Sequence, residues 1–234
     1  MNIESIQNGV ANYWFVFSFS FLTALTGAMS PGPLLTYTII QSVQQKKRGY
    51  LMGFWIISGH ALIELLIILL LLLGFSFIFQ QYYVVRLIGI VGGLILVYFG
   101  ISLIKDIYQG KISSDFIGDY ESSDSKPRHD MQNPVIGGIM VSMSNPYFWI
   151  WWASIGIAFL VEFEITIKTW PKLLMFFLGH EFGDLVWYVL ISILAFFGAR
   201  HLNQKAYYGL LFCCALFMVG FGIYLGLSPF FKNS

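Results

Sequence analysis

Charged residues are scarce in this chain of 234 residues: Lys, Arg, Asp and Glu together make up 11% of it, against about 25% in a typical soluble domain. So few charges cannot cover the surface of a water-soluble protein of this length. Hydrophobic residues make up 57%, against about 45–50% in soluble domains. We therefore expect most of the surface to face membrane lipid, which predicts an integral membrane protein.

The chain also lacks a positive surplus and a cysteine framework. Its net charge of +1 provides no basic surface, so we expect no nucleic-acid partner. The two cysteines, Cys213 and Cys214, are neighbours in an apolar run, which excludes a disulfide framework and a cysteine zinc site. We expect no cofactor. No Lys or Arg precedes residue 46, so we expect no cleaved signal peptide either.

Long stretches without charge predict membrane-spanning helices. A helix needs about 20 apolar residues to cross the hydrocarbon core, and its backbone groups must bond within the helix there. We predict an all-α membrane protein with six transmembrane helices, over residues 13–43, 50–74, 84–104, 134–160, 173–198 and 206–228.

Residues 105–133 form a long polar stretch between the third and fourth predicted helices. We interpret it as a flexible cytoplasmic linker between a first three-helix repeat, 1–104, and a second, 134–234. With both termini outside, the cytoplasmic segments carry nine Lys and Arg residues and the outer segments carry four. Because positive residues favour the cytoplasmic side, we predict a multi-pass protein of the inner or plasma membrane with both termini outside.

The two halves resemble each other at three places, in the same order along the chain. An offset of 120 residues relates His60 to His180, an offset of 122 relates Phe99-Gly100 to Phe221-Gly222, and an offset of 114 relates Met29-Ser30-Pro31 to Met143-Ser144-Asn145. Each half holds three spans, an odd number, so the second half must be inverted relative to the first. Inverted repeats of this kind are typical of transporters.

Prolines interrupt the first and fourth predicted helices. Pro31, Gly32 and Pro33 lie in the first, and Asn145 and Pro146 lie in the fourth. Proline removes a helical hydrogen bond and disfavours helix before it. Each break lies about 12 residues, or about 18 Å, from the cytoplasmic end of its span. Broken backbone at that depth is typical of a cavity wall, so we predict a central substrate cavity there; a plain proline kink is the alternative.

Three carboxylates lie well inside predicted spans: Glu64, Glu181 and Asp184. A charge at the bilayer centre costs about 2.5–3.5 kcal/mol, so such residues indicate function. His60 lies four residues before Glu64 and His180 four before Asp184, which puts each pair on one helix face. An imidazole next to a carboxyl group can exchange a proton near neutral pH. We predict that all five residues couple transport to protons; an internal hydrogen bond within each pair is the alternative.

The segment Ser30-Pro31-Gly32-Pro33, the basic loop after it at residues 44–49, and Asn145-Pro146 resemble the lysine exporter (LysE/RhtB) family, over about residues 15–227. The resemblance implies a six-span exporter of amino acids and related small metabolites, driven by protons or by the membrane potential. It assigns Pro31, Gly32, Pro33, Asn145 and Pro146 to the backbone of the central cavity.

The sequence departs from the family in two respects. Tyr147, Phe148 and Trp149 follow Asn145-Pro146, where the family has a Lys and small residues, and the spans carry more acidic residues than a member usually has. Aromatic faces and carboxylates both attract ammonium groups. We therefore assign Trp149 to the cavity and expect a small-molecule substrate that can be cationic; lipid-facing packing of the tryptophans is the alternative.

Other functions remain open on the sequence. Two histidines and three carboxylates can bind a divalent metal, so a metal-cation exporter of the same superfamily is the main alternative. His180-Glu181-Phe182-Gly183-Asp184 differs by one residue from the H-E-x-x-H pattern of zinc proteases, but the first half has no Glu in the corresponding place. A shared cavity fits this better, and we expect no enzyme. Gly89-x-x-x-Gly93 and Gly222-x-x-x-Gly226 allow close helix contact within the bundle or in a homodimer.

Overall fold

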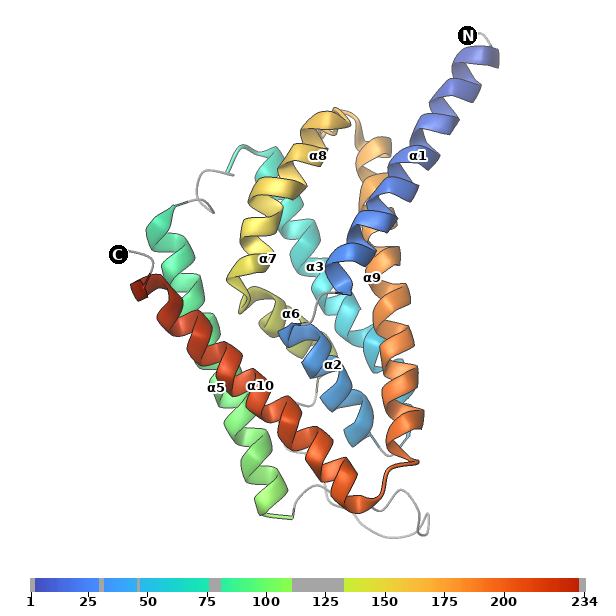
Figure 1. The fold of residues 1–234 in the computed structure, drawn as a ribbon. Coiled ribbons are helices and arrows are strands. Elements are labelled where there is room, and N and C mark those ends of the chain that lie inside the picture. The colour runs from blue at the N-terminus through green and yellow to red at the C-terminus, as the bar shows by residue number, and fades with distance from the viewer. Residues whose placement is uncertain (1–2, 30–31, 46, 76–80, 111–132, 232–234) are drawn as a thin grey trace.

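The computed structural model describes residues 3–29, 32–45, 47–75, 81–110 and 133–231 (Figure 1). In these ranges all regular elements are helices, which confirms the all-α prediction. In chain order they are α1 (Ile3–Ala28), α2 (Pro33–Gln44), η1 (Gly49–Leu51), α3 (Met52–Leu72), α5 (Tyr82–Tyr108), α6 (Pro134–Met143), α7 (Pro146–Trp151), η2 (Trp152–Gly156), α8 (Ile157–Glu162), α9 (Trp170–Ala199) and α10 (Gln204–Phe231).

Among the described residues, four helices are long and apolar enough to cross a membrane: Gly49–Leu72, Arg86–Tyr108, Trp170–Ala199 and Gln204–Leu227. The bent pair α1 and α2 makes a fifth if it counts as one span. The predicted span 134–160 is divided into shorter apolar helices. The prediction of a multi-pass membrane protein is therefore confirmed, while the six-span count is not reached by unbroken helices.

The predicted break in the first span lies between α1 and α2, whose axes are bent by 78° relative to each other. Helix α2 starts at Pro33, and Gly32 before it has an extended backbone. Proline is well tolerated at the first helical position because an N–H there has no partner in the helix. Pro31 lies outside the described residues, as does most of the predicted linker; α5 continues to Tyr108, past the predicted end of the first repeat at residue 104.

The second break separates α6 from α7. Helix α6 ends at Met143 and α7 starts at Pro146. The side chain of Asn145 accepts a hydrogen bond from the backbone N–H of Tyr147 at 3.1 Å and so caps α7. Helix α7 continues into η2, a π-helical turn. The N–H of Tyr147, in the first turn of α7, has no acceptor within the helix, and the cap supplies one.

The helices pack in pairs that join the two halves of the chain. Helix α5 packs along α10, α1 along α9, and α3 against both α6 and α9. Figure 1 shows α5 and α10 side by side at one edge of the bundle, with α1, α3 and α9 at the other edge. Helix α2 contacts α9, α10 and α6 between these two groups. The halves are therefore interleaved.

Glycines allow the closest of these contacts. A Cβ atom on Gly93 in α5 would lie 2.4 Å from the backbone oxygen of Gly222 in α10, and one on Gly222 would lie 2.7 Å from the oxygen of Gly93. The two glycine motifs therefore bring α5 and α10 together within the bundle. A homodimer stays a prediction that these glycines do not support.

The buried apolar side chains form three clusters. The largest lies among α2, α5, α6 and α10 and includes Tyr37 and Leu96. A second lies among α3, α7, η2 and α9 and includes Ile67, Trp152 and Phe176. The smallest joins the end of α1 to α3 and α9, and the first residues of α2 pack against it. The two helix breaks therefore lie between clusters, beside the place where α3 meets α9.

Replacing Gly93 with Ala should separate α5 from α10. The new methyl group would lie within 3 Å of backbone atoms of Gly222 and Gly226. Backbone atoms cannot move aside as the end of a flexible side chain can. We expect the free energy of unfolding to fall by about 1–3 kcal/mol, measured by denaturation in detergent micelles. Gly220→Ala is the matched control, since its Cβ meets nothing within 4 Å; equal stability of the two variants would contradict the described contact.

Candidate functional site

The site lies where α3 meets α9, and glycines place both helices. A Cβ on Gly59 would lie 2.0 Å from the backbone oxygen of Val135 in α6, and one on Gly179 would lie 2.3 Å from that of Phe17 in α1. Each glycine therefore holds its helix against the first helix of the other half. The next residue in each case, His60 or His180, is buried.

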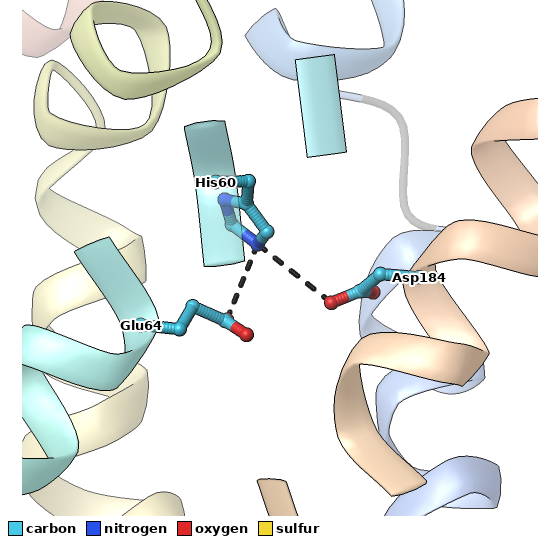
Figure 2. Close-up of side chains that lie close together, drawn as sticks. All are labelled: His60, Glu64 and Asp184. Atoms are coloured by element: carbon cyan, nitrogen blue, oxygen red, sulfur yellow. Dashed lines mark ion pairs between the residues drawn. The ribbon is translucent and has the colours of Figure 1, made fainter. Parts of the chain in front are cut away.

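Four buried side chains meet between the two helices. The Nε2 atom of His60 lies 3.2 Å from Oε1 of Glu64 and 3.7 Å from Oδ2 of Asp184. The Nε2 atom of His180 lies 3.7 Å from the same Oε1 of Glu64. Figure 2 shows the side chain of His60 reaching from α3 toward both carboxyl groups, one on its own helix and one on α9. The cluster therefore joins the two halves of the chain.

Ser142 contacts one nitrogen of the His60 ring. Its hydroxyl oxygen lies 2.7 Å from the backbone oxygen of Gly138 and 2.7 Å from Nδ1 of His60, and it has a single hydrogen to donate to one of them. When that hydrogen bonds to Gly138, Nδ1 is the donor to Ser142, and Nε2 can bond to the carboxyl oxygens only through a further proton on the ring or on an acid.

Several acceptor atoms of the site have no hydrogen-bond donor. Among the described residues, these buried atoms include Oε2 of Glu64, Oδ2 of Asp184 and both carboxyl oxygens of Glu181. The Glu181 carboxyl group lies next to that of Glu64, and two carboxyl groups can bond to each other only if one of them carries a proton. Because unpaired buried acceptors are costly, a proton or another positive charge beside these oxygens would stabilise the site.

The second helix break holds this cluster from both sides. Ser142, in the last turn of α6, binds His60. Trp152, at the start of η2, donates from Nε1 to Oε1 of Glu64 at 3.0 Å. The first break lies close by, because Ala28 and Leu34 pack with Ile57, one turn before His60. The breaks and the ionisable residues thus lie together.

The structure brings together the five residues that the sequence assigned to proton coupling: His60, Glu64, His180, Glu181 and Asp184. The indole N–H of Trp149 donates to the backbone oxygen of Met143 at 3.0 Å and so bridges the second break; its assignment to the cavity stays a prediction.

Sequence reasoning missed two residues that touch the cluster, Ser142 and Trp152. A serine in a transmembrane helix commonly bonds to its own backbone, so Ser142 carried no signal of a further partner. Trp152 belonged to a run of aromatic residues in which we assigned Trp149, three residues earlier, to the cavity.

The same atoms could hold a cation. One ligand atom from each of His60, Glu64 and Asp184 lies within 4.8 Å of the other two. One nitrogen and two carboxylate oxygens are ligands that divalent transition metals accept.

Apolar helices that cross a membrane, broken in mid-span around buried ionisable residues, define a membrane transport protein. A family model described as LysE type translocator matches residues 25–228. The chain belongs to this family, as the resemblance at Pro31 to Pro33 and at Asn145-Pro146 predicted. Comparison with curated proteins gives no match, and comparison with solved structures gives none either. Membership indicates membrane transport of amino acids or similar solutes, in a family of transporters and not of enzymes.

Replacing Ser142 with Ala should leave Nδ1 of His60 without its hydrogen-bond partner in a buried place. We expect this to lower the free energy of unfolding by about 1–3 kcal/mol, measured by denaturation in detergent micelles. Ser144→Ala is the matched control: Ser144 is buried too, but its hydroxyl bonds to Met140 in its own helix. If both variants unfold at the wild-type midpoint, the bond between Ser142 and His60 does not hold the ring.

Proposed function

We propose that the chain is a secondary active exporter of amino acids or related small metabolites, driven by protons or by the membrane potential. The observation that carries the proposal is the position of His60 Nε2 between carboxyl oxygens of Glu64 and Asp184. With Nδ1 bonded to Ser142, this position calls for a mobile proton. His60 and Glu64 belong to a helix of the first half and Asp184 to a helix of the second. Gain or loss of a proton between them would therefore change how strongly the two halves attract each other.

Two inverted three-helix repeats are part of the proposal, and the contact between α5 and α10 supports them. Gly222 lies against Gly93 and Val97, while Gly100 lies against Ala215 and Val219. The offset of 122 residues that relates Gly100 to Gly222 also relates Gly93 to Ala215 and Val97 to Val219. The contact therefore maps onto itself when the halves are exchanged, as a two-fold axis requires.

The other helix pairs support the same relation. Exchange of the halves turns the pair α1 and α9 into the pair α6 and α3, and both pairs are in contact. Six spans then follow if α1 with α2, and α6 with α7, η2 and α8, each make one broken span. Three spans in each half place the second repeat upside down in the membrane.

The orientation with both termini outside also belongs to the proposal. The loop with Lys47 and Arg48 precedes η1, and Arg200 ends α9. Figure 1 places the start of α3, the ends of α5 and α9 and the start of α10 at the lower end of the bundle, and the start of α1 at the upper end. Positive residues thus gather at one end, which we assign to the cytoplasm.

For the substrate we propose a cavity between the two breaks, lined by Pro31, Gly32, Pro33, Asn145 and Pro146, with Trp149 beside it. A cationic group on the substrate is supported by the unpaired carboxyl oxygens of Glu64, Glu181 and Asp184. A primary ammonium group has three hydrogens to donate. Aromatic rings also adjoin the site, since the rings of Trp151 and Phe176 lie 5.5 and 6.2 Å from that of His180.

Replacing Asp184 with Asn should abolish coupling but not folding. Asn has the same shape as Asp but cannot carry the charge that attracts a proton on His60. In reconstituted vesicles, we expect export driven by a pH gradient to fall about a hundredfold or more, while substrate exchange without a gradient continues. Glu162→Gln on α8, an exposed position, is the matched control. Export by Asp184→Asn at the wild-type rate across a pH range would contradict the coupling role.

A divalent metal cation is the second candidate substrate, favoured by the three ligand atoms within 4.8 Å. A panel of amino acids and divalent metals, taken up by inverted vesicles with and without a pH gradient, separates the two candidates. Amino-acid uptake that responds to the gradient supports the proposed function. Uptake of metals and of no amino acid would replace it with metal export.

A further inference from the structure

Trp152 is completely buried, and its indole nitrogen donates a hydrogen bond to Glu64 in the site. From this geometry we infer that Trp152 is a positioning residue: it holds the plane of the Glu64 carboxyl group so that an oxygen faces both imidazoles, and Gly156 leaves space for the Trp152 ring. The inference deepens the proposed function and rests on it for the transport readout.

Three groups converge on a single oxygen of Glu64. Oε1 accepts the hydrogen bond from Trp152 at 3.0 Å and is also the oxygen that lies 3.2 Å from His60 and 3.7 Å from His180. The other oxygen, Oε2, has no hydrogen-bond donor. Rotation about the last torsion of a glutamate is soft, so without the indole N–H the plane of the carboxyl group would be held less firmly toward the histidines.

Packing keeps the indole ring of Trp152 still. Its centroid lies 5.0 Å from that of His180, 5.1 Å from that of Trp151 and 6.3 Å from that of Phe176. The ring therefore contacts the second histidine of the site in addition to Glu64. Movement of Trp152 would disturb both halves of the cluster.

The π-helical turn η2 provides the space that this ring occupies. It runs over Trp152–Gly156, and a Cβ atom on Gly156 would lie 2.4 Å from Cε3 of Trp152. Real Cβ atoms do not approach so closely, so the turn needs glycine at this position. Single π-turns inside α-helices are frequent at functional sites, and here the turn places an indole N–H on a buried carboxyl group.

Trp152 and Ser142 lie on opposite sides of the second break. Ser142 binds His60 from the α6 side, and Trp152 binds Glu64 from the η2 side. Their two partners are one helical turn apart on α3. A change in the bend between α6 and α7 therefore alters the position of Glu64 relative to His60, which is the spacing on which the shared proton depends.

Trp152→Phe and Gly156→Ala test the inference. The first removes the indole N–H but keeps an aromatic ring. The second adds a methyl group that displaces the Trp152 ring, at a residue that itself has no side chain in the site. The controls are Trp170→Phe, at an exposed tryptophan, and Gly220→Ala, whose new methyl group would have no atom within 4 Å. We expect both test variants to lower the ratio of export driven by a pH gradient to exchange without a gradient about tenfold.

A second measurement does not depend on transport. Infrared difference spectra of the purified protein between acid and neutral pH record the carbonyl stretch of buried carboxylic acids. Both test variants should shift this band relative to wild type, and neither control should. The inference would be overturned if Trp152→Phe had wild-type spectra and an unchanged ratio of driven export to exchange. An equal fall of export and exchange with unchanged spectra would overturn it as well.

The two proposals fail in different ways. If the wild-type protein exports no faster under a pH gradient, the proposed coupling is wrong, and the infrared band alone then decides the role of Trp152. If wild type is coupled and Trp152→Phe is coupled equally well with an unshifted band, the positioning role is wrong and the proposed function stands.

Discussion

The rest of the structure depends on one interaction: a buried imidazole nitrogen that faces carboxyl oxygens inside the apolar interior of a membrane protein. His60 Nε2 lies between Glu64 and Asp184, and such an arrangement is stable only with a positive charge or a proton between the partners. The surrounding helices make that arrangement specific. Ser142 bonds to the other ring nitrogen and Trp152 bonds to the Glu64 carboxyl group, so the position of the imidazole relative to the carboxyl oxygens is well defined.

The second helix break determines how the buried ionisable residues are bonded. A continuous helix bonds all of its inner backbone groups, but a broken one leaves some of them without partners. At the second break the side chains of Asn145 and Trp149 bond such groups. The break also turns the chain so that α6 and η2 reach α3 from different directions. A straight helix over residues 134–162 could not bring both Ser142 and Trp152 to neighbouring turns of α3.

Much of this could be predicted from the sequence, because the penalties for charge and for proline in a membrane are large. They located both helix breaks and the five ionisable residues, and the repeated His-x-x-x-acid spacing indicated that these would meet. Contacts between distant segments could not be predicted in this way. Neither the bond between Ser142 and His60 nor the bond from Trp152 to Glu64 follows from periodicity, since each depends on how the two parts of a span bent at Asn145 pack against α3.

The glycine contact between α5 and α10 has a mechanical consequence. Where Gly93 meets Gly222, backbone lies against backbone, with no side chain between them whose rotamer could adjust to a shift. Sliding one helix along the other would force carbonyl oxygens against Cα atoms, so these two helices should move as one rigid pair. In the proposed transport cycle, the change between inward-open and outward-open forms would then be made by α1, α3, α9 and the two broken spans, which move relative to this pair.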